Sequence, residues 1–311
     1  MPIVNTQVPI TAASCNQMIE EIVKTYPFCR SELLTSSPFQ RPIRTLVIGE
    51  GPRKVIYSAA HHANEWITAL VLLKFGEELA QAIQSDGEIF GVSARALSQH
   101  ATIYMVPMVD PDGVDLVVGA IEVGQLQYDI ARRLAENYPT ISFPDGWKAN
   151  LLGVDLNLQY PAGWLQAREI KFSQGYTRPG PRDYVGRAPL NQLESRALAG
   201  YTEFIDPELV LAYHSQGKEI YWQFLDYEVA GARELGEIFA RVSGYSLAEV
   251  PYNSSFAGYK DWFIQQFRKP SYTIEVGSGT NPLPISQFDE IYRDNLGILV
   301  TAALGESTEK F

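Results

Sequence analysis

One short polar stretch of this chain, residues 61–66 (His-His-Ala-Asn-Glu-Trp), constrains its fold more than any other, because it joins two apolar runs. Residues 55–60 are typical of a buried strand, whereas residues 67–82 have apolar side chains at helical spacing. A strand that leads into a helix indicates an α/β fold, and open α/β sheets place their sites at the carboxyl edge. The glutamate lies three residues after one histidine and four after the other, so either histidine could converge with it.

Strand-like and helix-like runs alternate along the rest of the chain. Strands are predicted at residues 43–48, 54–59, 102–107, 209–213, 219–224 and 271–274, and helices at 15–25, 66–84, 125–137, 191–204, 227–242, 257–267 and 287–303. Turn signals predict a hairpin through residues 49–52 and a tight turn at 110–113, and residues 161–186 are expected to be a long loop. Because helices interleave with strands, we predict a three-layer α/β/α sandwich with a mixed central β-sheet.

The charge balance argues against several classes of partner. The chain of 311 residues has a formal net charge of −11 and no basic run, whereas nucleic-acid binding needs clustered lysine and arginine. No stretch approaches the roughly 18 apolar residues that span a bilayer, so we expect no membrane insertion. Cys15 and Cys29 are too few for a disulfide framework and are expected to be unpaired thiols.

Histidine is scarce in this chain, which limits where a metal site could form. Besides His61 and His62, the sequence contains only His100 and His214. His214 ends an apolar strand, as His62 does, whereas His100 lies in a polar stretch and is expected to be exposed or structural. Two histidines, a glutamate and an open position for water describe a catalytic zinc site. Each histidine alone is more often a satisfied core group, but their places at strand ends favour the metal site.

Two further acids are candidates for roles beside such a metal. Glu275 follows a β-rich run and precedes a flexible turn, where a carboxylate could act as general base on a metal-bound water. The alternative is an ordinary surface glutamate. Asp155 is a candidate partner of a ligand histidine, because such histidines usually donate their other N–H to a carboxylate. The alternative for Asp155 is a capping or turn acid.

Five motifs occur in one order along the chain. They are His62-x-x-Glu65-Trp66, Pro107-x-x-x-Pro111-Asp112-Gly113, Gly153-Val154-Asp155-x-Asn157, His214-Ser215 and Thr273-x-Glu275. No single motif is decisive, but the ordered set resembles the zinc metallocarboxypeptidase family over nearly the whole chain. This resemblance implies a single zinc peptidase domain at residues 13–311, with residues 1–12 as a lead-in or linker.

The resemblance also implies the roles of individual residues. His62, Glu65 and His214 would bind one zinc ion, and the first histidine of the pair would be a neighbour rather than a ligand. Glu275 would be the general base that activates the zinc water and later protonates the leaving amine. Asp155 would orient the first ligand histidine.

The sequence departs from the family at the positions that set its substrate. The family's exopeptidases have an Asn-Arg pair whose arginine clamps the substrate's terminal carboxylate, but this chain has Asn157 and Leu158. The family's oxyanion-stabilising arginine corresponds to Lys148, which supplies the charge as a point donor. The mobile tyrosine that covers the site corresponds to Tyr252, with Tyr259 as second candidate.

These departures resemble one bacterial branch of the family, the γ-D-glutamyl-L-diamino acid endopeptidases. The resemblance implies cleavage of murein peptides between γ-D-glutamate and a diamino acid, often diaminopimelate, in sporulating bacteria. Such a substrate carries several carboxylates, and the loop at residues 168–187 offers cations. We expect Arg182 to be its main substrate contact, although these charges could also be a solvated loop.

Two other functions stay open. One is a zinc carboxypeptidase or amidohydrolase that acts on other peptides. Leu158 disfavours the carboxypeptidase, unless another arginine from the long loop takes over the role of the missing one. The other is a metal-free murein-binding module, which the presence of both histidines and both glutamates disfavours. The sequence has no secretory signal at its start, which predicts a cytoplasmic protein, or a wall-associated one if a leader or wall-binding repeats precede it. Nothing in the sequence indicates the oligomeric state.

Overall fold

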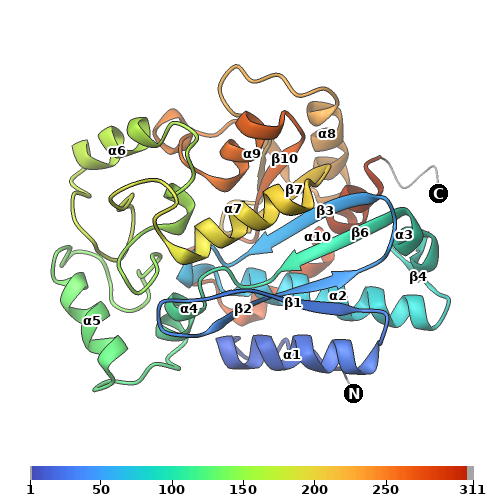
Figure 1. Ribbon diagram of the computed structural model, residues 1–311, viewed down its shortest axis with the longest axis horizontal. Coiled ribbons are helices and arrows are strands. Elements are labelled where there is room, and N and C mark those ends of the chain that lie inside the picture. Colours follow the sequence, from blue (N-terminus) through green and yellow to red (C-terminus); the bar gives the residue numbers. More distant parts are fainter. Residues whose placement is uncertain (1, 307–311) are drawn as a thin grey trace.

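The computed structural model describes residues 2–306 and shows one large mixed sheet between two layers of helices (Figure 1). The eight strands lie in the order β1-β2-β6-β3-β7-β10-β8-β9. The central neighbours β6, β3, β7 and β10 are all parallel to one another, whereas the pairs β1–β2, β2–β6 and β10–β8 are antiparallel. The predicted α/β/α sandwich is therefore confirmed. The strands are β1 Arg30–Ser36, β2 Pro42–Ile48, β3 Arg53–Ala59, β6 Ala101–Val106, β7 Leu209–His214, β8 Glu219–Tyr221, β9 Ser246–Ala248 and β10 Ser271–Glu275.

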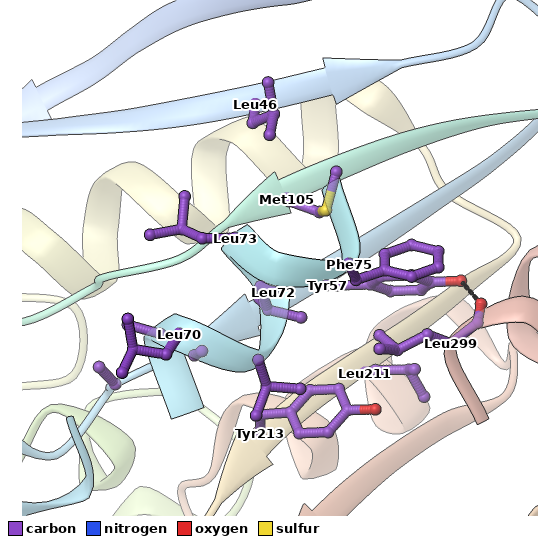
Figure 2. Close-up of a cluster of buried hydrophobic side chains, with 14 of the residues drawn as sticks. Leu46, Tyr57, Leu70, Leu72, Leu73, Phe75, Met105, Leu211, Tyr213 and Leu299 are labelled. Atoms are coloured by element: carbon purple, nitrogen blue, oxygen red, sulfur yellow. Dashed lines mark hydrogen bonds between the residues drawn. The ribbon is translucent and has the colours of Figure 1, made fainter. Parts of the chain in front are cut away.

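Side chains that alternate along each central strand pack into two separate hydrophobic clusters, one on each face of the sheet. Tyr57 belongs to the first cluster and its neighbour Ile56 to the second. In the first cluster the Tyr57 hydroxyl donates a hydrogen bond of 2.7 Å to the carbonyl oxygen of Leu299, which ties β3 to a covering helix (Figure 2). The helices of this layer are α1 Ala12–Thr25, α2 Ile67–Gln84, α3 Ala94–His100, α8 Ala232–Ser243 and α10 Phe288–Leu304.

The opposite face is covered by α7 Leu193–Ile205 and α9 Tyr259–Phe267. The helices α4 Pro111–Val117, α5 Leu126–Ala135 and α6 Trp164–Ser173 lie beyond the end of the sheet toward which the arrowheads of β3 and β6 point (Figure 1). Several loops at that end contain short 3-10 turns, among them η1 Ala63–Glu65, η2 Leu156–Leu158 and η3 Tyr252–Ser254. The carboxyl edge of the parallel strands is thus surrounded by irregular chain, as expected for a site.

The predicted hairpin between the strands around residues 43–48 and 54–59 is wrong. Strand β6 lies between β2 and β3 and pairs with both of them. The true hairpin joins β2 to β1. Strand β1 has no apolar pattern that would predict it, because most of Arg30–Ser36 is polar and only partly buried. The turn at residues 49–52 therefore connects β2 to β3, which are separated in the sheet by β6.

Two segments predicted as irregular contain helices. Residues 110–113 were expected to be a tight turn, but Asp110 caps α4, and its side chain accepts a hydrogen bond from the Gly113 N–H. Proline at the first helical position is compatible with this start, because its missing N–H would be unpaired there. The long loop predicted at residues 161–186 contains α6.

Before α1, Val4 and Ile10 are buried against the domain, and the Ile3 N–H donates to the Glu77 carboxylate. Within residues 2–306, none of the helices is long and apolar enough to cross a membrane. Cys15 and Cys29 are both buried and unpaired, as predicted.

Candidate active site

The three predicted metal ligands converge at the carboxyl edge of the sheet. His62 follows β3, Glu65 ends the 3-10 turn η1, and His214 is the last residue of β7, which pairs with β3. The Nδ1 atom of His62 lies 2.9 Å from Glu65 Oε1 and 3.1 Å from His214 Nδ1. The Nδ1 atom of His214 lies 2.9 Å from Glu65 Oε2.

The geometry of these three groups fits a zinc ion. Two ligands at about 2.0–2.1 Å from a tetrahedral zinc stand roughly 3.3 Å apart, close to the distances between these atoms. All three side chains are buried, and three ligand atoms from them lie within 4.8 Å of one another. They form the one such cluster of histidine, cysteine and acid side chains among the described residues. Two neutral imidazoles and a carboxylate suit zinc and leave a fourth position open.

Asp155 lies beside His62 on the side of the ring away from Glu65. Its Oδ1 atom lies 3.1 Å from His62 Nε2, so the Nδ1 atom of that ring is directed at Glu65. Burial opposes ionisation of Asp155, but His62 and Lys148 outweigh burial and hold the pKa of this carboxyl well below its usual range. Asp155 is therefore a carboxylate that fixes the orientation of the imidazole.

Glu275 ends β10 and stands beside His214, because these two residues are partners in the register of β10 and β7. Burial, followed by the charge of Glu65, raises the pKa of the Glu275 carboxyl to about 8 when no cation is bound. The position of this carboxyl beside the converging ligands is the one that a group exchanging protons with a metal-bound water would need.

Lys148 is anchored between two segments of the site. Its N–H donates a hydrogen bond of 2.7 Å to the Pro181 carbonyl oxygen, and its own carbonyl oxygen accepts one of 3.1 Å from the Ala63 N–H. The Nζ atom lies 3.8 Å from Glu65 Oε1. Burial disfavours the ammonium, but the carboxylates of Glu65 and Asp155 outweigh it and raise the pKa of Lys148. The side chain is therefore a positive charge beside the metal position.

The other two histidines lie outside the cluster of ligand atoms. His61 is buried behind it, with Nε2 3.2 Å from the Tyr160 hydroxyl and the ring stacked on His214 at 5.6 Å between centroids. Burial, followed by the charge of His214, lowers the pKa of His61, so the ring is neutral. His100 ends α3, and its Nε2 lies 3.1 Å from the Leu304 carbonyl oxygen, which is a structural place.

Two cavities open from the metal position, with volumes of about 320 and 620 Å³. Lys148, Arg182, Tyr221 and Glu275 line both of them. The smaller cavity also contacts His62 and His214, whereas the larger one contacts Glu65. The converging side chains therefore lie in the walls of two cavities that share four lining residues.

The predicted substrate contacts differ in how they relate to these cavities. Asn157 and Leu158 both line the smaller cavity, where the Asn157 side-chain oxygen also accepts a hydrogen bond from the Tyr259 N–H. Tyr252 is exposed on η3, and its near neighbours line this cavity although Tyr252 itself does not. Tyr259 is fully buried and its hydroxyl lies 2.6 Å from that of Thr202. Tyr259 is therefore a packing residue and not a mobile cover.

Two charged residues of the smaller cavity are not among the predicted site residues. Lys260 and Asp261 lie in the first turn of α9 and are both buried. The available signal was a lysine and an aspartate side by side within the otherwise apolar and aromatic helix predicted at residues 257–267.

Comparison with known proteins decides the family. Residues 15–297 match the sequence profile of the zinc carboxypeptidases. The chain belongs to this family. It is therefore a metallopeptidase, and the predicted resemblance is confirmed. The γ-D-glutamyl-L-diamino acid endopeptidase 1 of Lysinibacillus sphaericus is 42% identical to it over 282 residues, which cover 91% of this chain and 69% of that protein.

Solved structures show the same fold at low sequence identity. Thrombin-activatable fibrinolysis inhibitor superposes with a TM-score of 0.73 at 16% identity, covering 98% of this chain and 77% of the other. The murein-tripeptide amidase MpaA of Escherichia coli O157 superposes with a TM-score of 0.53 at 18% identity, covering 87% and 91%. These likenesses establish that the chain has the carboxypeptidase fold.

Proposed function

We propose that this metallopeptidase hydrolyses the bond between γ-D-glutamate and a diamino acid, diaminopimelate, in murein peptides. The observation that supports this most is Leu158, an apolar residue in the wall of the smaller cavity, where the family's exopeptidases have a carboxylate-binding arginine. Leucine cannot bind a terminal carboxylate, so the usual reason to cut at the last peptide bond is missing. The 42% identical relative is named for cleavage at a γ-D-glutamyl bond.

The proposal assigns His62, Glu65 and His214 to one zinc ion, for which their geometry is suited. When bound, zinc would polarise the scissile carbonyl and acidify a water molecule. Glu275 would accept the proton of the attacking water and later transfer it to the leaving amine. Lys148 would stabilise the negative charge that develops on the carbonyl oxygen.

The substrate's other carboxylates need cations in an acidic protein. Arg182 lines both cavities, and its Nε donates a hydrogen bond of 2.7 Å to Asp183. A guanidinium has five N–H donors, so this contact leaves others for a substrate carboxylate. Lys171 also lines the smaller cavity and is 2.6 Å from the other oxygen of Asp183. We propose Arg182 as the contact for the α-carboxylate of D-glutamate.

Hydrolysis of L-Ala-γ-D-Glu-diaminopimelate, next to release of C-terminal residues from ordinary peptides, tests this function. We expect free diaminopimelate to appear and ordinary C-terminal residues to remain bound. The opposite pattern would make the protein a carboxypeptidase or amidohydrolase on other peptides. Binding of murein peptides without zinc in elemental analysis, and without turnover, would indicate a metal-free binding module.

We also propose that the protein acts in cell-wall metabolism of sporulating cells and is cytoplasmic. The two buried, unpaired thiols support a reducing compartment, since disulfides are rare there. Fractionation of cells before and during sporulation, followed by immunodetection, tests the location. Recovery with the wall fraction would contradict the cytoplasmic assignment.

A further inference from the structure

A buried ion pair lies in the wall of the smaller cavity, away from the metal ligands in sequence. The Lys260 ammonium contacts the Asp261 carboxylate, and each residue is less than 5% exposed, at 3% and 4%. Their neighbours on α9, among them Tyr259, Trp262 and Phe263, belong to the second hydrophobic cluster. Both charged residues nevertheless line the cavity that holds His62, His214 and Glu275.

Such a pair is not explained by stability. Desolvation of two charges costs several kcal/mol per ion in real proteins, and apolar replacements of buried pairs are often neutral or stabilising. Burial raises the pKa of Asp261 even though Lys260 opposes this shift, so Lys260 compensates the carboxylate only in part. Asp261 also accepts the Gly258 N–H at 3.3 Å as part of the cap of α9, but that cap does not require a buried lysine.

The pair retains hydrogen-bonding capacity. Lys260 donates to Asp261 and to the Gln223 carbonyl oxygen, which accounts for two of the three protons of its ammonium. Asp261 uses Oδ1 for Lys260 and Oδ2 for the Gly258 N–H, and each carboxylate oxygen has room for a second partner. The cavity wall therefore offers one positive and one negative group side by side, each able to bind a further partner.

We propose that Lys260 and Asp261 recognise the far amino-acid head of the diamino acid, with Lys260 bound to its carboxylate and Asp261 to its ammonium. This inference rests on the proposed function, in which diaminopimelate supplies the leaving amine. The head of diaminopimelate carries an ammonium and a carboxylate on one carbon, so it complements two adjacent opposite charges. Leu158, Val250, Pro251 and Phe256 supply apolar surface in the same cavity for the carbon chain that joins the two ends.

The pair also explains discrimination against lysine as the diamino acid. A lysine side chain ends in an ammonium alone, so it satisfies Asp261 and leaves Lys260 facing a second positive charge. A site built to bind a polar group rejects an analogue that lacks it, because the buried partner stays unpaired. The site should therefore select a zwitterionic end and not simply a long basic side chain.

Four tripeptides of the form L-Ala-γ-D-Glu-X test this with the wild-type holoenzyme. X is meso-diaminopimelate, the same residue amidated at its distal carboxylate, the same residue acetylated at its distal amine, or L-lysine. We expect kcat/KM to fall by at least about tenfold for each altered head. The expected tenfold difference corresponds to about 1.4 kcal/mol, which is a modest requirement for a lost charged contact. Values of kcat/KM within about twofold of each other for the first two peptides would therefore overturn the role of Lys260.

Variants of Lys260 then test whether this residue is responsible for the difference in kcat/KM between the peptides with free and amidated diaminopimelate. Lys260→Met should lower kcat/KM for diaminopimelate and leave the amidated peptide unchanged, so that the ratio between them falls toward one. Lys260→Arg should retain most of the ratio. The matched control is Lys269→Met, which removes one positive charge from an ion pair with Asp206 outside both cavities and should leave the ratio at its wild-type value. A loss of the ratio in this control would contradict a specific role of Lys260.

The two proposals fail in different ways. If no γ-D-glutamyl peptide is cleaved while another peptide is, the proposed function is wrong and the head recognition falls with it. If all four tripeptides are cleaved equally, the function stands and only the recognition is overturned. The zinc content and the thermal midpoint of Lys260→Met show whether this variant has lost recognition of the substrate or has failed to fold. If it does not fold, the rates of the wild-type enzyme on the four tripeptides still test the recognition.

Discussion

Glu275 is the residue on which the proposed chemistry depends most. Replacement of its carboxyl by the amide in Glu275→Gln preserves the shape of the side chain but removes the proton acceptor. General acid–base groups contribute about 10²–10⁴-fold, so we expect kcat to fall by that factor. Zinc content, measured by elemental analysis, should not change, because Glu275 is outside the group of converging ligand atoms. Near-normal turnover would remove Glu275 from the mechanism.

Substitution of His62 should affect zinc binding, in contrast to substitution of Glu275. His62→Ala removes one of three converging ligands and also frees Asp155, which lies 3.1 Å from the ring. We expect most of the zinc to be lost after dialysis, together with activity. His61→Ala is the matched control, because His61 contacts Tyr160 and lies behind the ligands. Zinc loss in the control alone would reverse the assignment of ligand and neighbour.

Two substitutions of Lys148 test whether its positive charge contributes to catalysis. In Lys148→Met the point charge near Glu65 is lost, and we expect kcat to decrease by about 10²–10³-fold, as for loss of an oxyanion donor. Lys148→Arg preserves the charge and corresponds to the family's residue, so it should stay within about tenfold of wild type. Single-turnover rates on the same peptide measure both. Equal rates in the methionine and arginine variants would exclude an electrostatic role.

At the scale of single residues, motif order identified three side chains that the structure brings together. The spacing of His62 and Glu65 is local, and His214 had few competitors because the chain has four histidines. Lys260 and Asp261 could not be found in this way. Their importance comes from burial in a cavity wall formed by separate segments, and a pattern along one helix does not show which of its charged residues face such a wall.

At the scale of elements, strand composition predicted most strands but not their neighbours. The apolar runs of β2, β3 and β7 identified them, yet the order β2-β6-β3 depends on a parallel strand contributed from further along the chain. The edge strand β1 was missed because its partly exposed side chains lack the apolar pattern of the central strands. Strand pairing depends on how side chains pack against cross-strand and same-face neighbours, which local sequence does not report.

Two helical glycines test how tightly α4 is packed against the chain beside it. In α4, a Cβ on Gly113 would lie 2.2 Å from Asp110 Oδ2 and 2.7 Å from the Ala149 carbonyl oxygen. We expect Gly113→Ala to destabilise the protein by about 1–3 kcal/mol through overpacking. The control is Gly200→Ala in α7, where a Cβ meets nothing within 4 Å. Urea unfolding should show a gain of about 0.5–1 kcal/mol for the control. A gain in both variants would refute the close packing of α4.

At the scale of the whole molecule, buried carboxyls should make stability depend on pH. Glu194 in the first turn of α7 is fully buried and accepts a hydrogen bond of 3.2 Å from the Asn150 amide. Burial raises the pKa of Glu194 from 4.5 to about 7, and that of Asp110 is raised by burial and then by the charge of Glu194. Between pH 4.5 and about pH 7, the Glu194 carboxyl keeps its proton in the folded protein, whereas the same carboxyl in the unfolded chain has released it.

The sign of the effect follows from that proton. The contribution of Glu194 to the free energy of unfolding is fully present below about pH 4.5 and is lost as the pH rises through about 7. A shift of roughly 2.5 units corresponds to about 3 kcal/mol at 1.36 kcal/mol per unit. Glu194→Gln is neutral at every pH, so its free energy of unfolding should fall less than that of wild type between pH 5 and pH 8. Urea titrations of both proteins with zinc present at each pH measure this difference, and Glu136→Gln, which removes an exposed carboxyl, is the control. Parallel pH profiles for wild type and Glu194→Gln would show that this carboxyl is ionised in the folded protein, contrary to its burial.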